Sequence, residues 1–67
     1  MFIKIDKNKL YWLDVDNIYM NCYRPFNSLH DLKAFSIFAY GKGYLRFFEL
    51  KAIEQEINHI KNLNNFV

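Results

Sequence analysis

The first residues of the chain alternate between apolar and polar side chains, a pattern typical of β-strands. In residues 2–6, Ile3 and Ile5 fall on one side of an extended backbone. Residues 10–13 form a second apolar run, separated from the first by the polar segment 7–9. Two short runs joined by a polar turn predict a β-hairpin.

A third strand is predicted over residues 18–24. Residues 14–17 hold two aspartates and an asparagine, whose side chains bond to nearby backbone and therefore predict a turn or a bulge. Pro25 is expected to end the strand, because proline has no amide hydrogen for the ladder. Residues 25–32 form the longest irregular stretch, in which an Asn or Ser side chain could cap a short helical turn.

Residues 33–40 and 44–48 predict a fourth and a fifth strand, since their side chains also divide between two sides of an extended backbone. The segment Gly41-Lys42-Gly43 between them is the clearest turn signal in the chain. Two glycines at such a position suit a tight hairpin.

From about Glu49 the apolar period changes to that of a helix. A narrow apolar stripe recurs at helical spacing, with Leu63 at its edge, and comprises Leu50, Ile53, Ile57 and Ile60. This pattern predicts an amphipathic helix of about four turns. A helix of this length is marginal in water alone, so its apolar side is expected to dock on the sheet.

These elements predict one domain, residues 1–67, of the α+β class. We expect a small antiparallel β-meander of four to five strands with one C-terminal amphipathic helix packed on one face. The alternative is a small SH3-like barrel with the helix appended, which would bury both faces of the sheet.

Such a sheet would carry apolar side chains on both faces, whereas one helix can cover only one of them. The set expected to face the helix is Phe35, Ile37, Leu45 and Phe47. The set left on the other face is Phe38, Tyr40, Tyr44 and Phe48, with Arg46 among them, and Tyr19 and Tyr23 of the third strand extend it. An exposed face of an antiparallel sheet is normally polar, so these seven residues are the predicted protein-binding site.

Composition supports this prediction. Seven Phe, five Tyr and one Trp occur in 67 residues, and a domain of this size has too little interior to hide them all. Aromatic residues are enriched at the centres of protein interfaces. We therefore expect either a partner protein or a second copy of the chain to cover the predicted site.

The sequence offers no catalytic or metal-binding motif. Cys22, His30 and His59 match no known ligand spacing, and the Asp-rich segment 14–17 lacks the glycine and glutamate of a calcium loop. We expect no enzyme activity, no catalytic residue, no metal, no cofactor and no small-molecule substrate.

Nucleic acid is a weaker alternative as partner. The net charge is only +2, too small to indicate a nucleic-acid-binding protein by itself. Lys42-Gly43-Tyr44 begins like a basic-Gly-aromatic RNA-recognition signature, but Leu45 and Arg46 depart from it. The aromatic residues could still stack on the bases of a single strand.

The expected function is that of a small protein-binding module. The common Asn, Lys, Ile, Phe and Tyr residues have AT-rich codons, which suggests a phage or mobile-element factor. Such a factor would inhibit or modulate a host protein, for example a defence nuclease (anti-CRISPR-like) or transcription machinery. A structural subunit of a larger assembly is the other alternative. With no signal peptide and no run long enough to span a membrane, we expect the cytoplasm, that of the host if the chain is phage-encoded.

Overall fold

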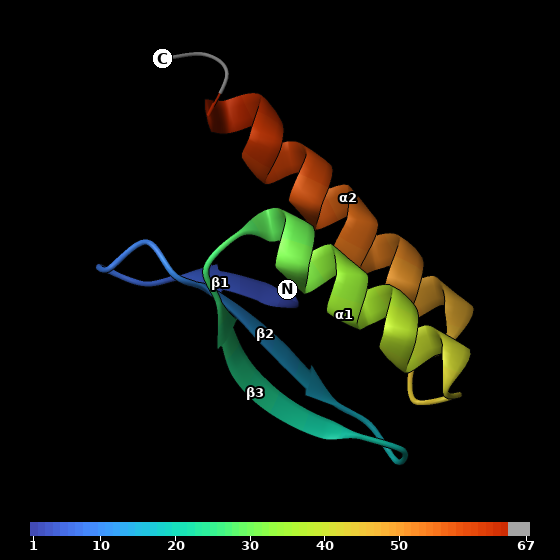
Figure 1. The fold of residues 1–67 in the computed structure, drawn as a ribbon. Coiled ribbons are helices and arrows are strands. Elements are labelled where there is room, and N and C mark those ends of the chain that lie inside the picture. Colours follow the sequence, from blue (N-terminus) through green and yellow to red (C-terminus); the bar gives the residue numbers. More distant parts are fainter. Residues whose placement is uncertain (65–67) are drawn as a thin grey trace.

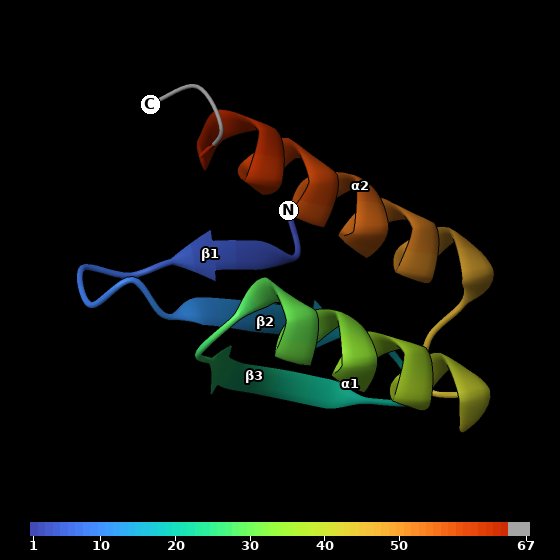
Figure 2. The same ribbon diagram turned by 45° about the horizontal axis from the view of Figure 1, so that its top comes forward.

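The computed structural model describes residues 1–64, which form a three-stranded antiparallel sheet and two helices. The strands β1 (Ile3–Ile5), β2 (Tyr11–Asp16) and β3 (Asn21–Phe26) lie in the order β1-β2-β3. The helices α1 (Leu29–Gly41) and α2 (Phe47–Asn64) pack side by side and cover one face of this sheet (Figures 1 and 2). The α+β class and the antiparallel sheet are confirmed. The four to five strands, the single helix and the alternative barrel are wrong.

The β1–β2 hairpin is present where the sequence predicts it. Ile3 pairs with Leu13 and Ile5 with Tyr11. The turn is organised by Asp6, whose Oδ1 accepts the backbone N–H of Leu10 at 3.0 Å and whose Oδ2 accepts the Trp12 indole N–H at 2.8 Å. These donors, the indole first, hold the pKa of the Asp6 carboxyl below its usual value.

The third strand begins and ends later than predicted, because β2 continues through Asp16 and the turn falls at Asn17–Met20. Pro25 lies inside β3, opposite Trp12, instead of ending it. The ladder explains why this proline is tolerated. Asp14 donates its N–H to the Phe2 carbonyl of the β1 side at 2.8 Å, so the even-numbered residues of β2 bond toward β1. In the alternating pattern of antiparallel strands, Pro25 then faces the free edge, where no N–H is needed.

Helix α1 occupies the segment that was predicted to hold the fourth strand, residues 33–40. It begins at Ser28, whose Oγ accepts the N–H of Asp31 at 3.1 Å. The buried residues of α1 follow a helical spacing, and they are Leu29, Leu32, Ser36 and Ala39. The predicted strand was wrong because small residues occupy half of the buried positions of the helix. Most of the large apolar side chains of this segment therefore lie on the other sides of the helix and do not show its period.

The glycine-rich segment 41–43 ends α1 and does not make a hairpin. Gly43 has a φ of 81°, and its N–H donates to the Tyr40 carbonyl at 3.0 Å, while Tyr44 N–H donates to the Ala39 carbonyl at 2.9 Å. This is the usual helix ending with a left-handed glycine. The predicted fifth strand, residues 44–48, is instead the connection between the helices and the start of α2.

The amphipathic helix predicted from about Glu49 is confirmed as α2 (Figure 1). Of its predicted apolar stripe, Leu50, Ile53 and Ile57 are buried, Ile60 is half-buried and Leu63 is exposed. The core lies between the helices and the sheet, where burial of apolar area supplies the main stabilisation. Its other members are Ile3, Leu13, Val15, Phe26, Leu29, Leu32, Ala39 and Leu45. Neither helix, as far as residue 64, is both long and apolar enough to cross a membrane.

One carboxylate joins α2 to the start of the chain. Glu56 accepts the backbone N–H of Phe2 through both oxygens and that of Ile3 through Oε1, all at 2.9 Å. Since Ile3 pairs with Leu13 at a non-hydrogen-bonded position of the ladder, its N–H faces the outer edge of β1. Glu56 therefore ties the start of β1 to α2, which runs along this edge (Figure 2).

Replacing Glu56 by Ala should destabilise the domain by about 1–3 kcal/mol, because two backbone donors lose a charged acceptor. Urea unfolding followed by circular dichroism measures this change. Glu54→Ala on the same helix is the control. Glu54 makes a surface ion pair with Lys51 at 3.9 Å, and its loss should cost no more than about 0.5 kcal/mol. Equal costs for the two variants would show that Glu56 does not secure β1.

Candidate protein-interaction surface

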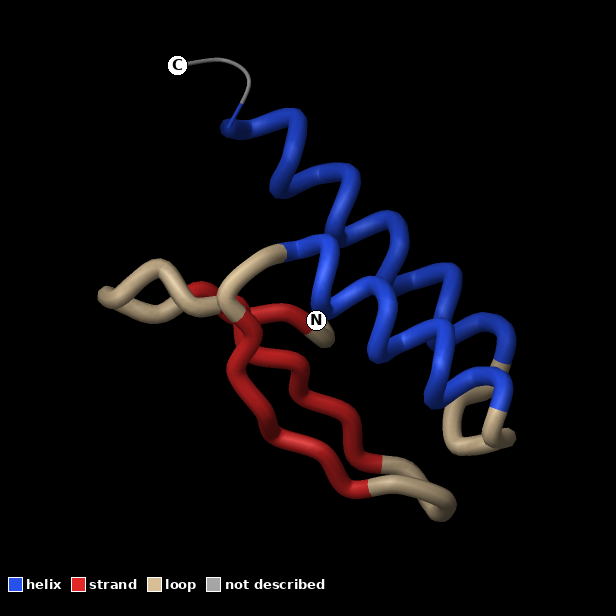
Figure 3. Tube along the Cα trace, viewed as in Figure 1, coloured by secondary structure: helices blue, strands red, loops and turns tan. Residues whose placement is uncertain are grey.

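Six of the seven residues predicted to bind protein lie at one end of the molecule, here called the turn end. It comprises the last turn of α1, the connection 42–46, the first turn of α2 and the β2–β3 turn 17–20. Figure 3 shows both connections at this end. The six residues are Phe38, Tyr40, Tyr44, Arg46, Phe48 and Tyr19. The structure thus brings them together through helices and loops, and not as one face of a sheet as the sequence analysis assumed.

The two connections at the turn end are joined through Asn17. Its Nδ2 donates to the Tyr44 carbonyl at 3.1 Å and to both Glu49 oxygens at 3.1 and 3.2 Å. Its Oδ1 accepts the N–H of Tyr19 at 2.7 Å and of Met20 at 2.8 Å. Glu49 is buried in the first turn of α2, where the helix dipole favours its charge. Asn17 and Glu49 therefore fix the β2–β3 turn against the start of α2.

Cations lie over aromatic rings at this end. The Lys42 Nζ lies 5.6 Å from the centroid of the Phe38 ring. The guanidinium carbon of Arg46 lies 4.2 Å from the centroid of the Tyr19 ring. The Arg46 guanidinium also donates to the Gly43 carbonyl at 2.8 Å. Cation–π attraction holds such side chains on the rings while their outer N–H groups stay in water.

A further pair of rings extends the surface across the two helices. Tyr40 of α1 and Phe47 of α2 have ring centroids 6.1 Å apart, and the Lys51 Nζ lies 5.4 Å from the Phe47 centroid. The expectation that Phe47 faces the core is wrong, because this side chain is 58% exposed. Ile37, expected on the same buried side, is also about half exposed, whereas Leu45 is buried and Phe35 half-buried.

Phe47, Lys42 and Lys51 also belong to this surface, although the sequence did not predict them there. Their signal was present, since Phe38 and Lys42, like Phe47 and Lys51, are four residues apart. That spacing places two side chains together only on a helix. Assigning the segment to strands concealed both pairs.

Tyr23 is the predicted residue that lies elsewhere. It projects from β3 on the face of the sheet without helices and stacks on Trp12, with centroids 4.7 Å apart and planes at 30°. Tyr23 is 60% exposed. It therefore does not belong to the turn end.

The candidate nucleophile and ligand residues lie in three different elements. Cys22 belongs to β3, His30 to the first turn of α1 and His59 to α2. Burial, the largest influence, raises the pKa of the Cys22 thiol, which keeps the thiol protonated and unreactive at neutral pH. Between residues 1 and 64, no group of three His, Cys, Asp or Glu side chains is placed to hold a metal ion.

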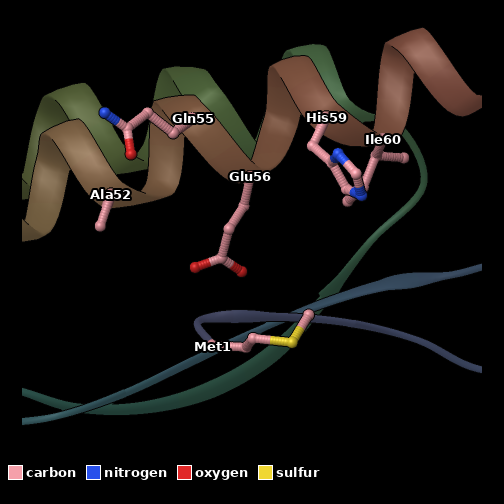
Figure 4. A pocket seen from close by; sticks show the side chains of 6 residues that line it. All are labelled: Met1, Ala52, Gln55, Glu56, His59 and Ile60. Carbon is pink, nitrogen blue, oxygen red and sulfur yellow. The ribbon is translucent and has the colours of Figure 1, made fainter.

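A shallow groove of about 410 Å³ runs between α2 and the start of the chain (Figure 4). Its walls are mostly apolar, and its one carboxylate, Glu56, is occupied by the backbone of Phe2 and Ile3. Of the ionisable side chains that line the groove, only His59 is exposed and without a hydrogen bond to the chain. Its lining residues are Met1, Ala52, Gln55, Glu56, His59 and Ile60.

Comparison of the chain with protein-family models, with curated proteins and with solved structures found no match.

Asn17→Ala should destabilise the domain by about 2–3 kcal/mol, since several hydrogen bonds to partly buried groups are lost at once. It should also speed amide exchange at Tyr19 and Met20, whose N–H groups lose their acceptor. Denaturant unfolding and hydrogen exchange measure the two effects. Asn58→Ala, on the exposed side of α2, is the matched control and should change stability by less than about 0.5 kcal/mol. An Asn17→Ala variant as stable as this control would contradict the role given to Asn17.

Proposed function

We propose that the chain is a non-enzymatic protein-binding module that uses the turn end as its binding surface. The observation that carries this proposal is the gathering of exposed aromatic side chains there. Phe38, Tyr40, Phe47 and Phe48 are 55%, 41%, 58% and 70% exposed, and Tyr19 and Tyr44 are 50% and 44% exposed. Exposed apolar side chains gathered at one end of a small domain are typical of interaction sites.

The partner that fits this surface is a protein with acidic groups among apolar side chains. Lys42, Arg46 and Lys51 surround the rings, and their N–H groups can bind carboxylates of a partner while the rings contact its apolar side chains. The one buried carboxylate at this end, Glu49, is already bound by Asn17 and by the Arg46 backbone N–H at 2.7 Å. It therefore offers little to a basic partner.

A single-stranded nucleic acid fits less well. Stacking of bases needs free ring faces, whereas Phe38, Tyr19 and Phe47 each have a cation of the same chain above the ring. A base would have to displace that cation. The composition suggests that this chain is a phage or mobile-element factor. Its partner would then be a protein of the host, which the chain binds.

Three short amphipathic helical peptides with the same apolar residues test the proposal. Their polar sides carry Glu, Lys or Gln. We expect the Glu peptide to bind at least about tenfold more tightly than the Lys peptide, since complementary charge favours it. Titration of the isotope-labelled full chain, followed by amide chemical shifts, should show changes concentrated on Tyr19 and on residues 40–51.

Charge reversal on α2 supplies the matched variants. Lys51→Glu should weaken binding of the Glu peptide several-fold, whereas Lys61→Glu, exposed in the last turn of the same helix, should leave it unchanged. A single-stranded oligothymidylate is titrated in parallel. Tighter binding of the oligonucleotide at the same residues would replace this proposal with the nucleic-acid one. Shifts that avoid the turn end, or equal binding of all three peptides, would refute it.

A further inference from the structure

The two edges of the sheet differ in how they are protected. The β1 edge is partly covered, because α2 contacts this strand and Glu56 accepts the N–H groups of Phe2 and Ile3. Strand β3 lies at the opposite edge, and nothing in the described part of the chain runs alongside it (Figure 2). An unpaired edge of this kind is a template for another strand.

The hydrogen-bonding groups that β3 presents are defined by the ladder. Asn17 donates its N–H to the Met20 carbonyl at 2.9 Å at the turn, so Cys22, Arg24 and Phe26 bond toward β2. Residues 21, 23 and 25 then point their backbone groups outward. Asn21 and Tyr23 offer both N–H and C=O, and Pro25 offers C=O alone.

This edge is complementary to itself. In an antiparallel pair of two β3 strands centred on Tyr23, the two tyrosines exchange two backbone hydrogen bonds. Asn21 of each copy lies opposite Pro25 of the other and donates to its carbonyl, which adds two more bonds. The missing N–H of Pro25 therefore costs one bond on each side and does not prevent pairing.

The helix layer leaves room for a second copy. Helix α1 contacts both β2 and β3, so it lies above the space between them, and α2 contacts β1. With strands about 4.8 Å apart, a two-fold axis at the β3 edge would separate the two α1 helices by about 10 Å, the usual packing distance.

The side of α1 that would meet its copy is aromatic. Phe35 contacts Phe26, with centroids 5.4 Å apart, and the Arg24 guanidinium lies over both rings, 5.0 Å from Phe26 and 5.2 Å from Phe35. Phe38, 6.4 Å from Phe35 and one helical turn further along, continues this aromatic side of α1. Phe38 is 55% exposed and would lie against its own copy.

We infer that the chain forms a two-fold symmetric homodimer by antiparallel pairing of its β3 strands, which makes one continuous six-stranded sheet. A second copy is the occupant because the outward-facing groups of this edge pair with those of a second β3 strand, and because α2 lies along the opposite β1 edge, which disfavours head-to-tail growth into a filament. An interface made of one short strand and the adjoining side of α1 belongs to the small end of specific interfaces. We therefore expect weak, reversible dimerisation. Phe47 and Phe48 of the turn end remain exposed in it.

Sedimentation equilibrium of the full chain over a wide concentration range tests this inference. We expect reversible association from the 8.2 kDa monomer to twice that mass. Tyr23→Pro should raise the dissociation constant at least about tenfold, because it removes the two central bonds of the pair. It removes the stacking of Tyr23 on Trp12 but should leave the helical circular dichroism of the monomer in place, since the N–H of Tyr23 is not used within the chain and Pro25 occupies an equivalent position.

Tyr23→Phe is the control and should dimerise as the native chain does. If Tyr23→Pro fails to fold, amide exchange of the native chain decides: the Tyr23 N–H should exchange slowly at high concentration and rapidly on dilution. A native chain that stays monomeric at millimolar concentration would overturn the inference. So would a folded Tyr23→Pro variant that still dimerises, or Tyr23 exchange that does not depend on concentration. Phe38 belongs to both surfaces, but none of these outcomes involves the acidic peptide, so the dimer and the binding of a partner are tested by separate measurements.

Discussion

The structure depends on close packing of two helices against one face of a very small sheet. Ser36 and Ala39 of α1 are fully buried, and small side chains at these positions let the helix approach its neighbours. The Ser36 hydroxyl is satisfied within the helix, because it donates to the Leu32 carbonyl at 2.9 Å. The core between the layers is therefore thin and mostly aliphatic, with Phe26 the aromatic residue buried in it.

That constraint determines where the aromatic side chains lie. A thin interior filled by Leu, Ile, Val and Ala has no space for the remaining rings, so they lie on the outer sides of α1 and α2, in the turns and on the open face of the sheet. Many of these rings are covered in part by a lysine or arginine of the same chain, or by another ring. Such contacts shield apolar surface from water and leave charged groups around it.

The sequence predicted the first hairpin and the last helix well, because both carry large apolar residues at the period of their own structure. It failed over residues 29–48. There the helical stripe of α1 is made of Leu29, Leu32, Ser36 and Ala39, and the two small residues do not register as apolar positions. The exposed rings of Phe38 and Tyr40 are two residues apart, and this alternation is the pattern that predicts a strand. The hairpin predicted at Gly43 was wrong for a similar reason, since a glycine in the left-handed conformation ends a helix as readily as it makes a hairpin turn.

The exposure of the predicted site residues was predicted better than the elements that carry them. A core too small for the aromatic residues leaves them exposed whether they belong to strands or to helices. The residues selected on this ground, from Phe38 to Phe48, therefore lie exposed at the turn end although the reasoning about sheet faces was wrong. Tyr19 was also predicted to join them, but through a shared sheet face. The contacts that bring it there, the long-range bonds of Asn17 to Tyr44 and Glu49, could not be derived from the sequence.

The central claim is that the aromatic residues of α2 lie outside the core. The most direct measurement is the relaxation enhancement of phenylalanine ring protons by a soluble gadolinium chelate, recorded on the native chain in dilute solution. The rings of Phe47 and Phe48 should relax strongly, whereas Phe26, 8% exposed, should be protected. If Phe47 and Phe48 are as protected as Phe26, the rings belong to the interior and the proposed surface does not exist.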